Sequence, residues 1–321
     1  MSSPTPPNVP IHNAQFEHSE HSEHSEHSEH SEQSVQSVQS EPFAFSPSPA
    51  STAQSTIVFV GGGNMASAIL GGLLKSGHEP QSLHVIEPLV SQRQQLQTLG
   101  VHTWDQPGEF LAMADLVVWA VKPQVFKEAA RAAAPWTPLT LHLSVAAGIT
   151  MHSMSEWLKA PRLVRAMPNT PALVGLGQTG LYANSAVSRQ DQALIEAVLQ
   201  STGQWLWLKD ESLLDAVTAI SGSGPAYVFY FLEAMCAAGE QMGLSAAEAK
   251  QLAIGTLIGA GHLASQSPET PGVLRERVTS KGGTTQAALE LMNQEALGDK
   301  FQAALWAAHR RAKALGEEFG H

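Results

Sequence analysis

The first residues in the chain that could take part in binding chemistry are small ones, and they lie between a strand-like and a helix-like segment. The apolar run Ile57-Val58-Phe59-Val60 leads into Gly61-Gly62-Gly63-Asn64-Met65-Ala66, and a helical pattern follows over 67–75. In the spacing Gly-x-Gly-x-x-Ala, the first glycine permits a tight turn, the second lets the backbone approach a pyrophosphate, and the alanine allows close helix packing. The helix N-terminus adds free N–H groups for phosphate. We therefore predict dinucleotide binding by Gly61, Gly63, Asn64, Met65 and Ala66; a purely structural turn is the alternative.

A second segment of glycines and hydroxyl residues lies near the other end of the chain. It reads Ser280-Lys281-Gly282-Gly283-Thr284-Thr285 and runs directly into a helical pattern over 286–292. Exposed N–H groups and hydroxyls converge at such a helix start, together with the positive end of the helix dipole. The pattern predicts an anion site that fits a carboxylate, and the structural alternative is an ordinary threonine N-cap.

Alternating strands and helices must position the first of these segments. We expect further strands over 83–86, 116–121 and 139–145, with helices over 92–99 and 125–134. This alternation predicts an α/β fold with a doubly wound parallel sheet, a Rossmann domain, whose ligands lie beyond the carboxyl ends of the strands. Two strand ends thereby become candidate cofactor contacts, namely Ala120, Val121, Lys122 and Pro123 in one, and Val145, Ala146 and Ala147 in the other.

An acidic residue ends the second predicted strand. Glu87 stands where a carboxylate accepts hydrogen bonds from the ribose hydroxyls of NAD and repels the 2′-phosphate of NADP. Arg93 follows six residues later, near enough to reach a phosphate if the helix starts early. The residues predict that both NADH and NADPH are accepted, with Glu87 lowering the affinity for NADPH.

The pattern changes after residue 167. A short αβ stretch to Leu208 is followed by helices, among them 226–242 and 246–264, which carry apolar or small residues nearly all round. Such helices must be buried on most of their surface. We predict a disordered tail over 1–55, a Rossmann domain over 56–167, and a mainly helical substrate-binding and dimerisation domain over 168–321, with an extensive homodimer interface.

Composition narrows the class of protein and its compartment. The net charge is −11, of which seven glutamates in residues 1–55 supply −7, which leaves −4 for the remainder. Without a basic stripe we expect no nucleic-acid partner. The single cysteine, Cys236, excludes an intramolecular disulfide or a thiolate metal site, and no basic residue precedes Lys75. We expect a soluble cytoplasmic protein with no targeting signal, no membrane span and no metal site.

The first 55 residues have the composition of a disordered tail. Proline-rich stretches flank five His-Ser-Glu triplets at 18–32 and a polar Gln/Ser/Val tract. Such a segment buries too little apolar surface to offset its chain entropy. Each histidine lies beside a glutamate in a flexible chain, so any metal site there would be weak and unorganised, and we favour a functionless or solubilising extension.

Five motifs together resemble pyrroline-5-carboxylate reductases. They are Gly61 to Ala66, Ala120 to Pro123, Arg165-Ala166-Met167-Pro168-Asn169-Thr170-Pro171, Ser221-Gly222-Ser223-Gly224-Pro225-Ala226-Tyr227, and Ser280 to Thr285, and they occur in the order and spacing of that family from about Thr56 onward. The resemblance implies reduction of 1-pyrroline-5-carboxylate to L-proline with NADPH or NADH, the last step of proline biosynthesis. It also implies a helical domain that intertwines in a homodimer, with assembly into rings such as decamers.

The resemblance also assigns substrate-loop roles. Ser280 and the backbone around Gly282, Gly283 and Thr284 correspond to a clamp for the substrate carboxylate, and the Thr285 hydroxyl corresponds to the group that hydrogen-bonds the ring nitrogen. Lys281 stands where many relatives carry proline.

Two other functions are compatible with a cofactor domain of this kind. A β-hydroxyacid dehydrogenase has a similar cofactor domain but needs a catalytic lysine on a helix of its second domain, and the helix at 226–242 has no lysine. An NAD(P)-binding redox-sensing regulator without turnover would be expected to carry a degraded substrate loop, whereas the segment from Ser280 to Thr285 is complete.

Overall fold

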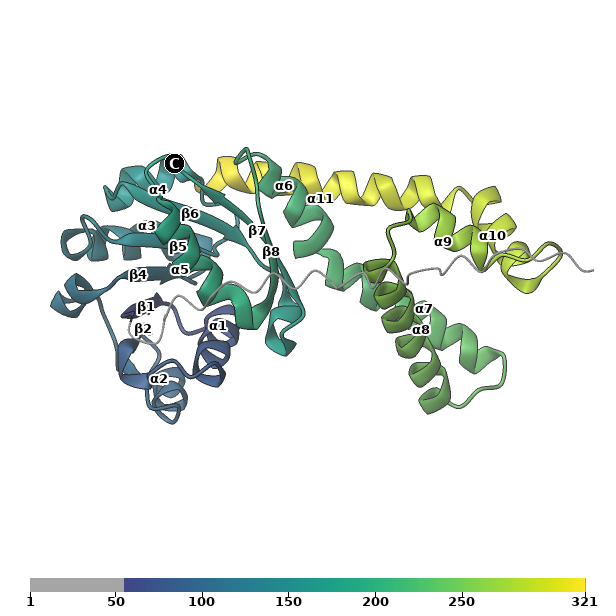
Figure 1. Cartoon of the computed structure of the whole chain (residues 1–321), viewed down its shortest axis with the longest axis horizontal. Helices are drawn as coiled ribbons and strands as arrows, with labels where there is room; N and C mark the ends of the chain where they lie inside the picture. Colours follow the sequence, from purple (N-terminus) through teal and green to yellow (C-terminus); the bar gives the residue numbers. More distant parts are fainter. Residues whose placement is uncertain (1–54, 321) are drawn as a thin grey trace, which may run out of the picture. The chain divides into compact units, whose positions relative to one another are not determined.

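The computed structural model describes residues 55–320, in which one eight-stranded sheet carries helices on both faces (Figure 1). The strands run in the order β3-β2-β1-β4-β5-β6-β7-β8. Their bounds are β1 Ile57–Val60, β2 Leu83–Ile86, β3 His102–Trp104, β4 Leu116–Trp119, β5 Leu141–Ser144, β6 Arg162–Met167, β7 Gly177–Ala183 and β8 Gly203–Trp207.

The first six strands are parallel and follow the order typical of dinucleotide-binding folds, which confirms the predicted fold class. The carboxyl ends of β1 and β4 lie side by side, because Val60 pairs with Trp119. The chain crosses from one side of the sheet to the other between these two strands. The connections that leave these two strands run to opposite faces of the sheet, which leaves a ligand crevice beyond the carboxyl ends of the strands.

Helices on the two faces close two apolar clusters. The α-helices between and after the strands are α1 Asn64–Lys75, α2 Val90–Gln97, α3 Pro123–Ala133, α4 Met151–Leu158 and α5 Arg189–Leu199. Side chains of α1, α2 and α5 pack with Ile57 and Phe59 on one face, and those of α3 and α4 pack with Val58 and Val60 on the other. Since both faces are covered, β1 has four apolar residues in a row instead of an alternating pattern.

Short 3-10 helices link these elements. They are η2 Pro80–Ser82, η3 Glu109–Met113, η4 Ala134–Trp136, η5 Thr170–Val174 and η6 Gln200–Thr202. The predicted strands at 57–60 and 83–86 have the observed bounds, while the predicted helix at 67–75 begins three residues earlier, at Asn64.

The predicted domain boundary at residue 167 falls inside the sheet. Strand β7 pairs antiparallel with β6, Val164 lying opposite Ala183, and β8 then pairs parallel with β7. The αβ stretch up to residue 208 therefore extends the same sheet, and the purely helical part follows it.

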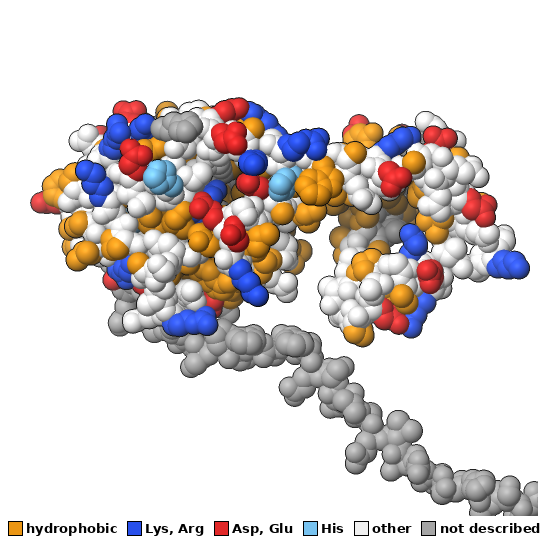
Figure 2. Space-filling view, turned by 90° about the horizontal axis from the view of Figure 1, so that it is seen from above, with side chains coloured by type: hydrophobic (Ala, Val, Ile, Leu, Met, Phe, Trp, Pro, Cys, Tyr) orange, Lys and Arg blue, Asp and Glu red, His pale blue; other side chains and the backbone are white. Residues whose placement is uncertain are grey.

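The remaining helices form the C-terminal part. They are α6 Leu213–Val217, the π-helix η7 Thr218–Gly222, α7 Gly224–Gln241, α8 Ala246–Gln266, α9 Pro271–Arg277, α10 Thr284–Gln294 and α11 Leu297–Phe319. Helices α7 and α8 pack against each other but bury few residues within the chain. Phe229 is 64% exposed and Ile258 is 68% exposed, and apolar side chains reach the surface in Figure 2. Among residues 55–320, no helix is long and apolar enough to cross a membrane.

Candidate active site

A cavity of about 730 Å³ opens above the carboxyl ends of β1, β2 and β4. The glycine turn after β1 forms one wall, Glu87 and Pro88 after β2 form another, and Ala120 to Lys122 after β4 form a third. This is the crevice at the switch point of the sheet, where dinucleotides bind in such folds.

The glycine turn is shaped by close contact with the next strand. Gly61 has a φ of 97°, and a Cβ at this position would lie 2.7 Å from the carbonyl oxygen of Ala120. Its N–H donates to the carbonyl of Ile86 at 2.8 Å. Only glycine fits this combination of left-handed backbone and close approach. A Cβ at Gly63, by contrast, would meet nothing within 4 Å, so that residue has open space beside it for a ligand.

Helix α1 begins directly after this turn and presents an uncapped N-terminus. Its N-cap residue is Gly63, no side chain caps the first turn, and that turn holds no acidic residue. The N–H groups and the positive end of the helix dipole are therefore available to an anion such as a pyrophosphate.

Glu87 is held rigidly at the edge of the cavity. One carboxylate oxygen accepts the N–H of Gly62 at 3.0 Å, and the other accepts the N–H of Leu89 at 2.9 Å. The Gln92 amide donates to the carbonyl of Gly62 at 2.9 Å, so side chains hold both polar groups of this glycine. Arg93 donates to the carbonyls of Glu87 and Pro88, each at 2.7 Å. The turn after β2 thus presents a fixed carboxylate, and its arginine is bonded to backbone.

Six of the residues expected to contact the cofactor line this cavity. They are Gly61, Gly63, Glu87, Ala120, Val121 and Lys122. Asn64, Met65 and Ala66 form the start of α1, where Ala66 is buried against the sheet, and Pro123 begins α3. Val145 packs at the edge of the apolar cluster below, while Ala146 and Ala147 line a separate small cavity with Met167 and Thr218.

Sequence reasoning missed a wall of the cavity. Asp105, Gln106 and Pro107 line it after β3, a three-residue strand that was not predicted. Two of its three residues are exposed, so it lacks the apolar run that marks the inner strands. The Asp105-Gln106-Pro107 cluster of turn-forming residues was the available signal, since such clusters often follow strands.

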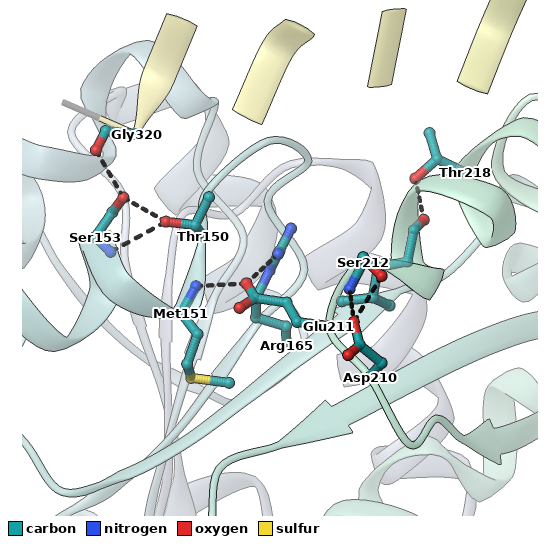
Figure 3. A network of polar contacts seen from close by, with 10 residues as sticks. Thr150, Met151, Ser153, Arg165, Asp210, Glu211, Ser212, Thr218 and Gly320 are labelled. Carbon is teal, nitrogen blue, oxygen red and sulfur yellow. Dashed lines mark hydrogen bonds and ion pairs between the residues drawn. The ribbon is translucent and has the colours of Figure 1, made fainter. Parts of the chain in front are cut away.

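A polar network surrounds the carboxyl end of β6 (Figure 3). Glu211 accepts the N–H of Met151 at 2.6 Å and forms an ion pair with Arg165. The pair lines a cavity of about 530 Å³ together with Asp215 and Lys313. Burial raises the pKa of the Asp215 carboxyl, which the Arg165 charge partly offsets. The network ties the end of β6 to the start of α4 and to the segment that precedes α6.

The predicted substrate loop stands at the start of α10. Gly282 has a φ of 72°, a left-handed backbone that favours glycine, and a Cβ at Gly283 would lie 2.6 Å from the Ser280 hydroxyl and 3.2 Å from its carbonyl oxygen, so Ser280 would have to shift to admit one. The N–H of Gly282 donates to the Gln286 side chain at 2.6 Å. Residues 280–285 do not line the 730 Å³ cavity, so the structure of one chain does not bring the two predicted subsites together.

The threonine N-cap interpretation of this loop is wrong. The N-cap residue of α10 is Gly283, no side chain caps the helix, and Thr285 is its second residue. Among the described residues, the Thr285 hydroxyl forms no hydrogen bond and is therefore free for a ligand. Within residues 55–320, no group of three or more His, Cys, Asp or Glu side chains is placed to hold a metal ion.

Comparison with known proteins places this geometry in a family. Residues 211–315 match the family model described as pyrroline-5-carboxylate reductase dimerisation, and residues 56–148 match the model described as NADP oxidoreductase coenzyme F420-dependent. The pyrroline-5-carboxylate reductase of Pseudomonas aeruginosa is 42% identical over 267 residues, which cover 82% of this chain and 98% of that protein. The Arabidopsis thaliana enzyme is 33% identical over 274 residues, or 84% and 98% of the two chains.

Two solved structures of pyrroline-5-carboxylate reductases are similar to the structure of this chain. That of a pyrroline-5-carboxylate reductase from Coxiella burnetii has a TM-score of 0.76 at 38% identity and covers 81% of this chain and 98% of its own. The Plasmodium falciparum pyrroline carboxylate reductase with NADP bound has a TM-score of 0.74 at 27% identity, covering 82% and 99%.

The Rossmann sheet, the glycine turn and the crevice above β1 and β4 define an NAD(P)-dependent oxidoreductase. The chain belongs to the pyrroline-5-carboxylate reductase family. The enzymes of this family reduce pyrroline-5-carboxylate to proline with NAD(P)H, and neither the redox-sensing regulator nor the β-hydroxyacid dehydrogenase is favoured.

Proposed function

We propose that this chain binds NADPH or NADH along the crevice above β1 and β4 and reduces 1-pyrroline-5-carboxylate to L-proline. The observation that carries the proposal is the glycine turn. Gly61 is forced into contact with Ala120, Gly63 faces open space, and the uncapped start of α1 lies beside them. A pyrophosphate fits this combination of free N–H groups and close backbone approach. When bound, the dinucleotide would supply a hydride to the imine carbon.

The protein's own contribution is to hold the cofactor in place. Glu87 would accept hydrogen bonds from the adenosine ribose, and Ala120 to Pro123, with Val145 to Ala147, would follow the cofactor toward its nicotinamide end. Small side chains at these strand ends leave room for close contact, and Lys122 adds a positive charge to the lining of the crevice.

The substrate would be held by the loop at α10. The Ser280 hydroxyl and the first-turn N–H groups of α10 from Thr284 onward, which have no side-chain cap, would bind its carboxylate. Gly282 and Gly283 would shape the turn, because their own N–H groups donate to the Gln286 side chain and to the Ser280 carbonyl. The Thr285 hydroxyl would hydrogen-bond the ring nitrogen. A pyrroline nitrogen is already partly protonated near neutral pH, so positioning accounts for most of the catalysis that these residues supply.

A homodimer would bring the two subsites together. Hydride transfer needs contact between nicotinamide and imine, and the loop of one chain does not line the crevice of the same chain. We propose that α7 and α8, whose exposed apolar residues match the family's dimerisation region, form the dimer interface. Assembly into a decamer, a cytoplasmic location and a dispensable tail over 1–55 belong to the same proposal.

The decisive experiment is direct turnover. Purified full-length protein is incubated with pyrroline-5-carboxylate and either NADH or NADPH, and absorbance of the reduced nicotinamide is followed while L-proline is quantified. We expect equal amounts of nicotinamide oxidised and proline formed. Oxidation of the nicotinamide without proline, or no oxidation with either cofactor, would overturn the proposal.

Complementation tests the shared site. Gly61→Ala damages the crevice and Thr285→Ala damages the loop, so each homodimer should be inactive or weak. Refolding or coexpression of the two variants gives mixed dimers in which one site has both an intact crevice and an intact loop, if the two come from different chains. Activity above both parents is the expected result, and no gain would mean that one chain supplies both.

A further inference from the structure

Two motifs with no role in the chemistry above are joined to each other in the structure. The Asn169 side chain donates from Nδ2 to the carbonyl of Ser221 at 3.1 Å, and its Oδ1 accepts the N–H of Gln178 at 2.9 Å. Asn169 is 8% exposed, so both ends of a buried amide are satisfied. The contact connects the segment after β6 with a segment 52 residues later in the chain.

Close packing reinforces this contact. A Cβ at Gly222 would lie 2.6 Å from the Met167 methyl carbon, so the end of the Met167 side chain packs directly on the Gly222 backbone and would have to move to admit a side chain there. Met167 ends β6, and Gly222 ends the π-helix η7. Asn169 and Met167 therefore both contact the end of η7. We refer to Met167, Asn169, Ser221 and Gly222 together as the β6–η7 joint.

The η7 segment is itself unusual. The N–H of Ser223, the residue that follows η7, donates to the carbonyl of Thr218 at 2.8 Å, the wide spacing of a π-turn, and α7 begins at the next residue. Single π-turns shift the register of a helix and are frequent at functional sites. Here the π-turn lies where the sheet is followed by the helices that carry the dimerisation region and the substrate loop.

The joint also adjoins a predicted cofactor contact. Met167 and Thr218 line one small cavity together with Ala146 and Ala147, the loop after β5. The end of β6 is in turn fixed by the Arg165–Glu211 ion pair. Displacement of η7 at the joint would consequently alter the space beside the loop that we assign to the nicotinamide end.

We propose that Asn169 is a positioning residue for hydride transfer, which holds η7 against the end of β6 and so sets the geometry between cofactor loop and helical part. This inference rests on the proposed function. It predicts that weakening the joint slows the chemical step far more than it weakens cofactor binding, because the pyrophosphate would be held by the turn at 61–66, which shares no residue with the joint.

Asn169→Asp tests the joint with minimal change of shape. The carboxylate still accepts the Gln178 N–H but faces the Ser221 carbonyl with an oxygen in place of a donor. Asn184→Asp is the matched control, because Asn184 also bridges backbone groups of the sheet, donating to the Pro161 carbonyl at 2.8 Å and accepting the Leu163 N–H at 3.4 Å, without touching η7.

Steady-state kinetics, the deuterium isotope effect with cofactor labelled at C4, and melting temperature are measured for both variants. We expect Asn169→Asp to lower kcat about tenfold, the equivalent of one hydrogen bond, to enlarge the isotope effect on kcat and to change the KM of the cofactor much less than kcat. Protonation of the new carboxyl restores a donor, so the deficit should shrink toward acidic pH. Asn184→Asp should keep the wild-type kcat and isotope effect even if it melts at a similarly lowered temperature.

Two further measurements keep the inference testable if a variant folds poorly or if the proposed function fails. Gly222→Ala disturbs the joint from its other side, and adding Met167→Ala should restore space and part of kcat. Amide exchange over 218–226 without ligand should rise in Asn169→Asp and stay at the wild-type level in Asn184→Asp, whatever the substrate. Unchanged exchange, or equal loss of kcat in both asparagine variants, would overturn the inference, whereas a wild-type enzyme without proline formation would overturn only the proposed function.

Discussion

Thr285 is the second residue of α10, and its hydroxyl is left free because Gly283 occupies the N-cap position. If the hydroxyl holds the imine nitrogen, Thr285→Ala should lower turnover by roughly 10- to 150-fold, the equivalent of about 1.5–3 kcal/mol for a hydrogen bond to a charged group. Cofactor affinity and melting temperature should hardly change. Thr285→Ser keeps the hydroxyl and should retain most activity; a fully active Thr285→Ala enzyme would contradict the assignment.

Glu87 is the residue that should set cofactor preference. Its carboxylate is fixed by the N–H groups of Gly62 and Leu89, so it cannot swing away from a 2′-phosphate. We predict that Glu87→Ser lowers the Michaelis constant for NADPH relative to that for NADH. Glu79→Ser, which removes an exposed acid at the opposite end of β2, is the control and should change neither constant. Equal effects of Glu87→Ser on both cofactors would mean that the carboxylate does not face the ribose.

At the scale of elements, strand β5 carries a buried histidine whose protonation opposes folding. His142 is fully buried, its Nδ1 accepts the indole N–H of Trp119 at 3.0 Å, and burial lowers its pKa to about 4. Between pH 6.5 and about 4 the unfolded chain binds a proton that the folded chain does not, so stability falls as the pH falls through this range. A histidine pKa that burial lowers to about 4 corresponds to roughly 3 kcal/mol of stability that is present near neutral pH and lost in acid.

His142→Gln should remove most of that acid sensitivity, because glutamine keeps an acceptor for Trp119 and does not titrate. Urea unfolding at a series of pH values between 7 and 4.5 measures the slope. His152→Gln, a change at an exposed histidine of α4, should keep the wild-type slope. A slope that His142→Gln leaves unaltered would assign the acid sensitivity to other groups.

At the scale of the whole molecule, α7 and α8 expose large apolar side chains, among them Phe229, Leu252 and Ile258, which favours contact with a second copy of the chain. We predict an obligate dimer in which Ile258→Glu causes dissociation and loss of activity. Leu139→Glu is the matched control, since Leu139 is 73% exposed but lies beside the sheet. Sedimentation and activity at nanomolar concentration measure both. A stable, active monomer would contradict the dimer and the shared site together.

The tail offers a second prediction at this scale. Residues 1–54 lie outside the described part of the chain, and their composition is the sole basis for the expectation that they are dispensable. A chain that starts at Ser55 should keep kcat, KM and oligomeric mass. Loss of any of them would show that the His-Ser-Glu repeats contribute to the working enzyme.

The sequence by itself determined the features that depend on neighbouring residues. The glycine spacing from Gly61 to Ala66, the apolar strands β1, β2 and β4, and the loop from Ser280 to Thr285 are local patterns, because tight turns, buried strands and helix starts each require particular residues within a few positions. Together with the family resemblance, these patterns were enough to identify the fold class and the reaction.

Contacts between distant segments were decided only by the tertiary structure. The edge strand β3 has too few buried residues to be recognised from its sequence. Strand β7 lies beyond the predicted domain boundary but joins the same sheet, because it pairs antiparallel with β6. The clamp of Glu87 and Gln92 on Gly62 and the bond from Asn169 to Ser221 join residues 25 to 52 positions apart. No local pattern specifies such pairs, since they form only when packing of the sheet and its helices brings their backbones within hydrogen-bond distance.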